Sequence, residues 1–178
     1  MRILFMFLDG VGLGADDPTI NPFALAQMPN LAALLGGKRL LAGSAPFRGP
    51  RADLFALDAG LGTPGLPQSA TGQAVLLTGE NIPALLGYHY GPKPNPEVAR
   101  FLQDGGLFGQ FARAGKRAAL LNAYPPGYFS AISSGKRLYS AIPLAVSQAG
   151  LSLFTAADLH RGQAISADFT GLGWHERL

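Results

Sequence analysis

The sequence contains no cysteine, which excludes disulfide bridges and thiolate metal ligands. Any metal ion must therefore be held by carboxylate, hydroxyl or imidazole groups. The sequence also lacks an apolar run approaching the roughly 20 residues of a membrane-spanning helix, and residues 2–8 lack the cleavage site of a signal peptide. We therefore expect a cytoplasmic protein with no membrane partner.

Charge is scarce as well, because charged residues make up only 14% of the chain. The 14 basic residues form no run, so we do not expect a nucleic-acid partner. The net charge of +3 suits a small anionic substrate instead. With 178 residues, 48% of them hydrophobic, the chain is long enough to bury about 70% of its unfolded surface in a folded core.

The most informative stretch is LPQSATGQAVLLTG, at residues 66–79. Pro67 discourages an earlier helix start, so the pattern predicts a short buried helix from Ala70 with Ser69 as its N-cap and a stop at Gly79. A hydroxyl at the mouth of a helix lies near unsatisfied N–H groups and roughly +0.5 charge from the helix dipole. Such a position favours a phosphate or an alkoxide, although serine is also a common cap without further function.

The segment before this helix strengthens the functional interpretation. Residues 52–58 are strand-like, and the glycine-punctuated loop at 61–67 links them to Ser69. Many α/β enzymes mount a nucleophile on such a succession of strand, tight loop and helix. Ser69 is therefore the candidate nucleophile, and Thr71, in the same first turn, is the alternative.

The N-terminal residues 2–8 form a continuous apolar run, which predicts a strand buried on both faces. Asp9 follows directly, at the strand end where α/β sheets place ligands, although an Asp-Gly turn explains it equally well. Gly10, Gly12 and Ala15 also fit the spacing of a dinucleotide-binding loop loosely. That loop must open a helix, and the turn-rich residues 16–22 do not favour one.

The remaining elements follow from periodicity, proline and glycine. Pro29 interrupts the helical pattern of residues 23–35, so we expect two short helices or one broken helix there. We predict further helices at 82–86, at 96–103 with Asn95 as cap, at 107–114 and at 140–148. We predict strands at 38–41, 52–58, 116–122 and 164–168, the third of them buried and parallel to a neighbour. Residues 46–50 are expected to form a loop, 125–129 an aromatic loop and 158–162 a turn.

Three motifs in this order resemble the alkaline-phosphatase superfamily. They are the apolar strand into DGVG at 9–12, PQSATGQ at 67–73 and SAD at 166–168. The resemblance is to the branch of cofactor-independent phosphoglycerate mutase and phosphopentomutase, and most of all to its metalloenzyme relatives. Where the mutases carry a histidine after the glycine of the turn, this chain has Gln73.

The resemblance implies a three-layer αβα core with a mainly parallel sheet, incomplete here, plus part of a smaller α+β cap lobe. Residues 1–81 would belong to the core, and residues 82–178 would comprise a linker, a crossover and cap-lobe segment. The C-terminal half of the family core would be absent. His89, His160 and His175 do not fit the later ligand motifs of the family, and we interpret them as surface or packing residues.

The implied function is metal-dependent phosphoryl transfer, by a phosphatase or phosphomutase, through a phosphorylated serine. Asp9 and Ser69 would bind a divalent ion, Zn²⁺ or Mn²⁺, one of two ions in the complete enzyme. A small phosphorylated substrate would contact Gln73, Asn122, Tyr124 and Asp168. Because Asp9 and Ser69 are too few ligands for a closed site, we expect the 178-residue chain alone to be inactive and to bind metal weakly.

Two other classes of function remain as alternatives. A non-catalytic binding domain or subunit would explain why ligands are missing, and a dinucleotide-binding oxidoreductase would explain the glycine loop. If half of the core is absent, exposed apolar surface should lead to self-association or to pairing with a complementary chain.

Overall fold

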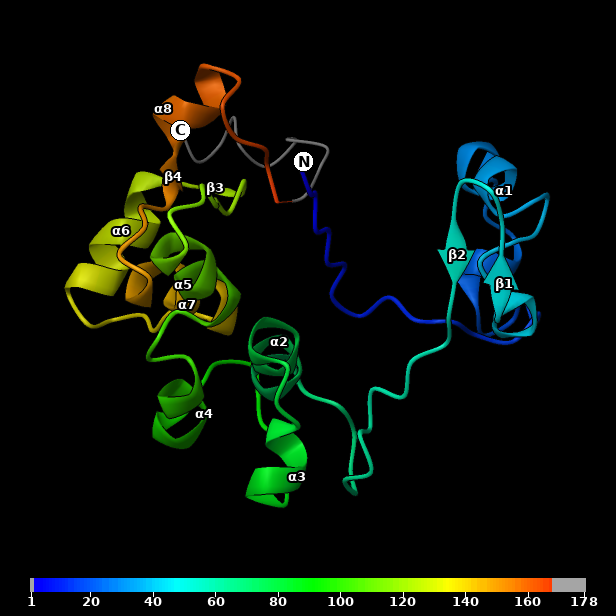
Figure 1. The fold of residues 1–178 in the computed structure, drawn as a ribbon, viewed down its shortest axis with the longest axis horizontal. Helices are drawn as coiled ribbons and strands as arrows, with labels where there is room; N and C mark the ends of the chain where they lie inside the picture. Colours follow the sequence, from blue (N-terminus) through cyan, green and yellow to red (C-terminus); the bar gives the residue numbers. More distant parts are fainter. Residues whose placement is uncertain (1, 168–178) are drawn as a thin grey trace. The chain divides into compact units, whose positions relative to one another are not determined.

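The computed structural model describes residues 2–167 and consists of 37% helix and 6% strand, with small sheets. The chain divides into two compact units, Met1–Asp58 and Ala59–Leu178 (Figure 1). This boundary lies before the helix that carries Ser69, whereas the sequence predicts a division after residue 81. No helix within the described part of the chain is long and apolar enough to cross a membrane.

The first unit contains short elements joined by turns. In chain order these are the 3-10 helix η1 (Pro22–Ala24), α1 (Pro29–Leu34), the 3-10 helix η2 (Ala42–Ser44), β1 (Phe47–Arg48) and β2 (Asp53–Leu54). The strands β1 and β2 pair antiparallel, with Phe47 opposite Leu54. Pro29 separates two short helices as predicted, because its ring sets the helical φ at the first position of α1 and supplies no N–H.

Residues 2–8 do not form the predicted buried strand. They have no regular secondary structure, and Ile3 and Leu4 are 70% and 77% exposed. A strand buried on both faces needs neighbouring strands, and among the described residues none pairs with this segment. The predicted strand at 38–41 is likewise wrong, and β1 lies in the expected loop at 46–50.

The second unit is built mainly from helices. They are α2 (Ser69–Thr78), α3 (Ile82–Leu86), α4 (Pro96–Phe101), α5 (Gly106–Arg113), α6 (Pro126–Ser133), α7 (Ala141–Gln148) and α8 (Ala156–His160). The strands β3 (Ala123–Tyr124) and β4 (Phe154–Thr155) pair in parallel, and Asn122 forms an isolated parallel bridge with Ile165. The parallel pairing agrees with the expected crossover.

Several predictions for this unit are wrong in detail. Residues 116–121 are mostly exposed and contain no strand, so pairing begins only at Asn122 and β3. The expected aromatic loop at 125–129 is largely helical, because Pro126 occupies the first position of α6, where its missing N–H costs nothing. Residues 158–160 belong to α8, and the turn is confined to the residues that follow.

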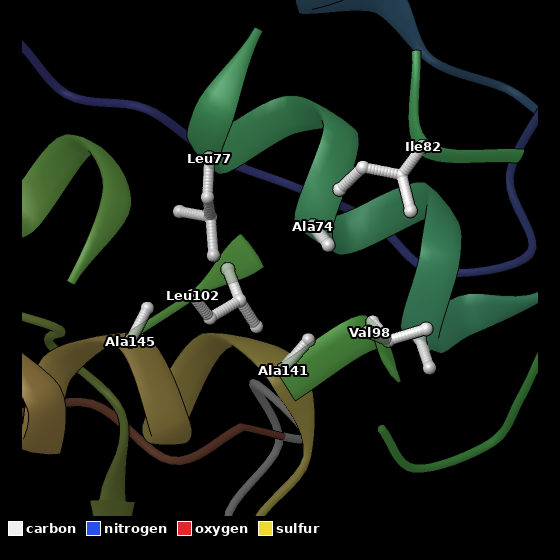
Figure 2. Close-up of a cluster of buried hydrophobic side chains, with 8 residues drawn as sticks. Ala74, Leu77, Ile82, Val98, Leu102, Ala141 and Ala145 are labelled. Carbon is white, nitrogen blue, oxygen red and sulfur yellow. The ribbon is translucent and has the colours of Figure 1, made fainter. Parts of the chain in front are cut away.

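Helix α2 lies at the centre of the second unit and packs against α3, α4, α5 and α7. Ala70, Ala74 and Leu77, spaced one helical turn apart, place one face of α2 in the core. Ile82, Val98, Leu102, Ala141 and Ala145 complete the buried cluster, and Figure 2 shows their side chains converging between the helices. At Gly106, a Cβ atom would lie 2.8 Å from the Leu77 carbonyl oxygen, so only glycine permits this approach of α5 to α2.

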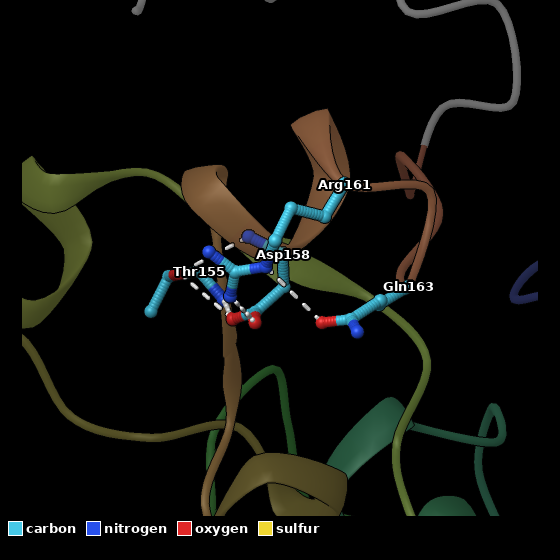
Figure 3. A network of polar contacts seen from close by, with 4 residues as sticks. All are labelled: Thr155, Asp158, Arg161 and Gln163. Carbon is cyan, nitrogen blue, oxygen red and sulfur yellow. Dashed lines mark hydrogen bonds and ion pairs between the residues drawn. The ribbon is translucent and has the colours of Figure 1, made fainter.

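Helix α8 begins with a capping box (Figure 3). The backbone N–H and hydroxyl of Thr155 donate to the Asp158 carboxylate at 2.7 and 2.8 Å, and the Asp158 N–H donates to the Thr155 hydroxyl. Arg161 donates to the same carboxylate at 2.6 Å. The hydrogen bonds from the backbone and side chain of Thr155 hold the pKa of Asp158 below its ordinary value.

Truncating the core at Leu102 should destabilise the second unit. Leu102 is fully buried, so Leu102→Ala should lower the free energy of unfolding by about 2–5 kcal/mol through lost contacts and a cavity. Leu85→Ala is the control, because Leu85 is 63% exposed and its loss should change stability by about 0.5 kcal/mol or less. Urea denaturation followed by far-UV circular dichroism measures both, and equal effects would contradict the assignment of the core.

The capping box should titrate at low pH. Because the pKa of Asp158 is lowered in the folded state, its contribution to stability is present above the ordinary value of about 3.9 and is lost as the pH falls through the folded pKa. The Thr155 amide resonance should report this titration with a midpoint below about 3.9. In Asp158→Asn the transition should disappear, and a wild-type midpoint above the ordinary value would refute the interaction.

Candidate functional site

Ser69 is the first residue of α2 and is half-buried. The structure confirms the predicted helix but corrects its cap. Gln68 is the N-cap, because its carbonyl accepts the first helical hydrogen bond, from Gly72 N–H at 2.9 Å. Gly79 ends the helix in the left-handed conformation, as predicted. Ser69 thus stands in the first turn, where the helix dipole is positive.

Thr71, the alternative nucleophile, has a different environment. Its side chain is fully buried, and its hydroxyl accepts a hydrogen bond from Tyr90 N–H at 3.2 Å. The Thr71 N–H donates to the Tyr90 carbonyl at 3.0 Å, and the hydroxyl lies 3.3 Å from the carbonyl oxygens of Gln68 and Tyr90. Thr71 therefore joins the first turn of α2 to the loop at 88–91, and Ser69 is the more accessible hydroxyl.

An open depression of about 360 Å³ lies beside the first turn of α2. It is lined by residues 64–66, Gln68 and residues 88–91. At Gly91 a Cβ atom would lie 3.1 Å from both the Ser69 nitrogen and Gln68 Cβ, so the backbone of the lining packs directly on the helix start. The depression is therefore adjacent to Ser69 and built from residues distant in the sequence.

Each aromatic residue of the 88–91 loop has its own anchor. The Tyr88 hydroxyl donates to the Glu97 carboxylate and accepts from Asn95 Nδ2 at 3.3 Å. The hydrogen bond to Glu97 raises the pKa of Tyr88, so its hydroxyl stays protonated at neutral pH. The His89 ring nitrogen Nε2 lies 3.3 Å from the Thr63 carbonyl oxygen. Because a carbonyl only accepts, Nε2 is the donor in this contact.

The loop that precedes α2 is also held in place. Leu61 adopts a left-handed backbone conformation with φ of 52°, which is unfavourable for a bulky side chain. The side chain of Asn81 donates to the Leu61 carbonyl at 3.0 Å and accepts from Ala84 N–H at 3.3 Å, so one residue caps α3 and anchors this loop. The approach to Ser69 is therefore coupled to the second unit's core through α3.

Of the other predicted site residues, Gln73 lies on the same helix as Ser69, and Asn122, Tyr124 and Asp9 lie elsewhere in the described part of the chain. Gln73 is buried one turn beyond Ser69 on α2, Asn122 precedes β3, and Tyr124 is part of β3. Asp9 is exposed in a turn of the first unit, where Val11 N–H donates to the Leu8 carbonyl. Asp168 lies outside the described residues. Of the predicted set, only Ser69, Thr71 and Gln73 share an element.

Tyr124 belongs to a cluster of aromatic side chains. Its ring stacks on Tyr128 with centroids 4.3 Å apart, and the Arg137 guanidinium lies 4.9 Å from the centre of the Tyr128 ring. Burial raises the pKa of Tyr124, and it raises that of Tyr128 to about 12. The hydroxyl of Tyr128 is buried and has no hydrogen-bond partner among residues 2–167. These contacts give Tyr124 a packing role in the structure.

The ligand set for a metal ion is incomplete in the described part of the chain. No group of three or more histidine, aspartate or glutamate side chains within residues 2–167 is arranged to hold an ion. Asp9 and Ser69 offer two oxygen donors and belong to different units. The described residues by themselves therefore do not fit a catalytic metal centre.

The dinucleotide-loop alternative lacks the helix that it requires. Residues 10–20 contain no helix, and the next helical residues form the single 3-10 turn η1. The amides of a helix N-terminus, which hold the pyrophosphate in such loops, are therefore not found directly after Gly14.

Removing the Thr71 hydroxyl should loosen the 88–91 loop. Thr71→Val keeps the shape of the side chain but removes the acceptor of the Tyr90 N–H, at a cost of about 0.5–1.5 kcal/mol. Hydrogen exchange should then be faster at the Tyr90 amide. Thr71→Ser is the control, because it keeps the hydroxyl and should preserve that protection. Equal exchange in both variants would contradict the link between α2 and the loop.

Comparison of the chain with protein-family models, curated proteins and solved structures finds no match. The resemblance to the alkaline-phosphatase superfamily therefore depends on the motifs around Asp9, Ser69 and Ser166 alone. Function has to be argued from the chemistry of these residues.

Proposed function

We propose that the chain belongs to a metal-dependent phosphoryl-transfer enzyme, a phosphatase or phosphomutase, in which Ser69 is the phosphorylated nucleophile. The observation that carries the proposal is the position of Ser69 in the first turn of α2, beside an open depression. There the helix dipole stabilises negative charge on the serine oxygen and on an approaching phosphoryl group. The fully buried Thr71 is the less suitable nucleophile.

The reaction transfers one phosphoryl group. The Ser69 oxygen attacks phosphorus and loses its proton, the bond from phosphorus to the ester oxygen breaks, and the alcohol leaves. The phosphoserine then passes its group to water or back to an alcohol. Positioning is the contribution of this chain, because α2 is held by the core and the depression beside Ser69 receives the organic part of the ester.

Zn²⁺ or Mn²⁺ is part of the proposal, with Asp9 and Ser69 as two of its ligands. When bound, the ion would neutralise charge on the phosphoryl oxygens. The remaining ligands would come from outside the described residues, because residues 2–167 hold no group of three. The proposal includes a three-layer αβα core, in which the exposed apolar residues 2–8 would find strand partners.

A non-catalytic binding domain is the second candidate. It is favoured by one observation, the missing three-ligand group among the described residues. In that case the depression beside α2 would bind a ligand without covalent chemistry, and Ser69 would remain unmodified.

Ser69→Ala should abolish turnover of a phosphate monoester in the native protein isolated from its own cells. We expect a loss on the order of 10³-fold or more, as for loss of a nucleophile, with stability changed by about 1 kcal/mol or less. The assay contains Mn²⁺ or Zn²⁺ and phenyl phosphate. Mass spectrometry of the acid-quenched wild type should find one phosphoryl group on Ser69. Ser133→Ala, at an exposed serine of α6, is the matched control.

In the same assay, Asp9→Asn distinguishes the contribution of metal binding from that of the Ser69 nucleophile. It should raise the metal concentration needed for turnover while leaving Ser69 able to react at saturating metal. Retained activity in Ser69→Ala, or phosphate on Thr71 instead, would refute the role of Ser69. Turnover of Asp9→Asn with an unchanged metal requirement would leave Asp9 a turn residue. An unmodified Ser69 with metal-independent ligand binding would favour the binding domain.

A further inference from the structure

We infer that the depression lined by Gln68, Tyr88, His89 and Tyr90 binds the organic group of the substrate, and that this group is an uncharged flat ring. The inference rests on the proposed function, because it names the substrate class of the same site as a phosphate monoester of a ring compound. It is carried by the side chains of the depression and by the way they are held.

The chemistry of the lining favours a neutral ring. None of the described residues that line the depression is an aspartate, glutamate, lysine or arginine, so a charged organic group would lose water without gaining an ion partner. Tyr88 and Tyr90 offer aromatic surface, with ring centroids 6.3 Å apart and planes at 74°. The two rings lie edge-to-face against one another, and aromatic side chains of this kind pack well against another flat ring.

The polar groups of the lining can orient such a ring. With Nε2 of His89 at the Thr63 carbonyl, Nδ1 is the ring nitrogen left for a ligand, and the Gln68 amide both donates and accepts. A few convergent polar groups among apolar side chains are typical of small-molecule sites. The volume of about 360 Å³ is within the range of such sites and exceeds what a phosphate ion alone would fill.

The wall is formed before any ligand arrives. Tyr88 is tied to Glu97 and Asn95, and Tyr90 is held through its backbone by Thr71. Little side-chain or loop entropy is therefore lost when a ring enters. The Tyr90 side chain makes none of the hydrogen bonds that hold the loop, so it can be shortened without releasing the wall. It is 36% exposed, as expected for a ring that meets a ligand.

The position of the depression would allow one ligand to place its ring there and its phosphate near Ser69. Gly91, a lining residue, packs on the Ser69 nitrogen, so a ring in the depression places a phosphate substituent next to the first turn of α2. An acyclic ester such as glycerol phosphate would reach the same turn but leave the aromatic wall uncovered. Selectivity for ring esters over acyclic esters is therefore the measurable consequence.

The test is an NMR titration of the chain carrying labelled tyrosine rings, with phenyl phosphate, glycerol phosphate, inorganic phosphate and phenol as probes. Phenyl phosphate should bind about tenfold more tightly than glycerol phosphate and should shift the resonances of Tyr88 and Tyr90. Tyr90→Ala should remove this preference, whereas Tyr90→Phe should keep it. Phe111→Ala is the matched control, because Phe111 on α5 is 37% exposed and lies outside the depression.

Equal affinity for the two esters, or an unchanged preference in Tyr90→Ala, would overturn the inference without using any variant of Ser69. Binding of phenol as tight as that of phenyl phosphate, with the same dependence on Tyr90, would uphold the ring site. That outcome would also remove support for a phosphate beside Ser69, so failure of the proposed function can be told apart from failure of the inference.

Discussion

The burial of one face of α2 is the interaction on which the rest of the second unit depends. Ala70 and Ala74 have small side chains, so neighbouring helices can approach the α2 backbone closely, and both residues are fully buried. Gly106 extends this close contact to the C-terminal end of α2. The buried face holds the helix, and the first turn, with the half-buried Ser69, lies at the other end from this contact. The position of the candidate nucleophile is thus a consequence of packing one turn away.

The same helix shows how two hydroxyl groups of similar chemistry can differ in their surroundings. Ser69 and Thr71 are two residues apart in a single turn, and the α-helical geometry points them in different directions. Thr71 points to the loop at 88–91 and accepts a hydrogen bond from the Tyr90 N–H, an interaction worth about 0.5–1.5 kcal/mol. Because its hydroxyl is engaged with the Tyr90 backbone, Thr71 cannot readily move during a reaction. Ser69 is half-buried at the helix start, whereas Thr71 is fully buried.

Much of the helical structure could be predicted because its signals are local. Pro96 at the first position of α4 and the Asn95 side chain, which accepts from Val98 N–H at 2.9 Å, mark that helix within four residues of sequence. Strands could not be predicted in this way. The apolar residues 2–8 and 116–121 have the composition of buried strands, but a strand forms only where a distant segment pairs with it. Composition shows only that a segment favours the strand conformation. Whether a strand forms depends on a second segment that pairs with it.

The loop at 88–91 was missed for the same physical reason. The sequence Tyr88-His89-Tyr90 gives no periodic signal, and a lone histidine between two tyrosines fits a surface position as well as a site. The loop is held in place by hydrogen bonds with Thr63, Thr71 and Glu97, which belong to three separate segments of the chain. The three contacts hold three different residues of the loop, so the loss of one should loosen the wall only in part. Side chains that line such a wall without holding it, as Tyr90 does, are free to serve a ligand, since the fold does not depend on them.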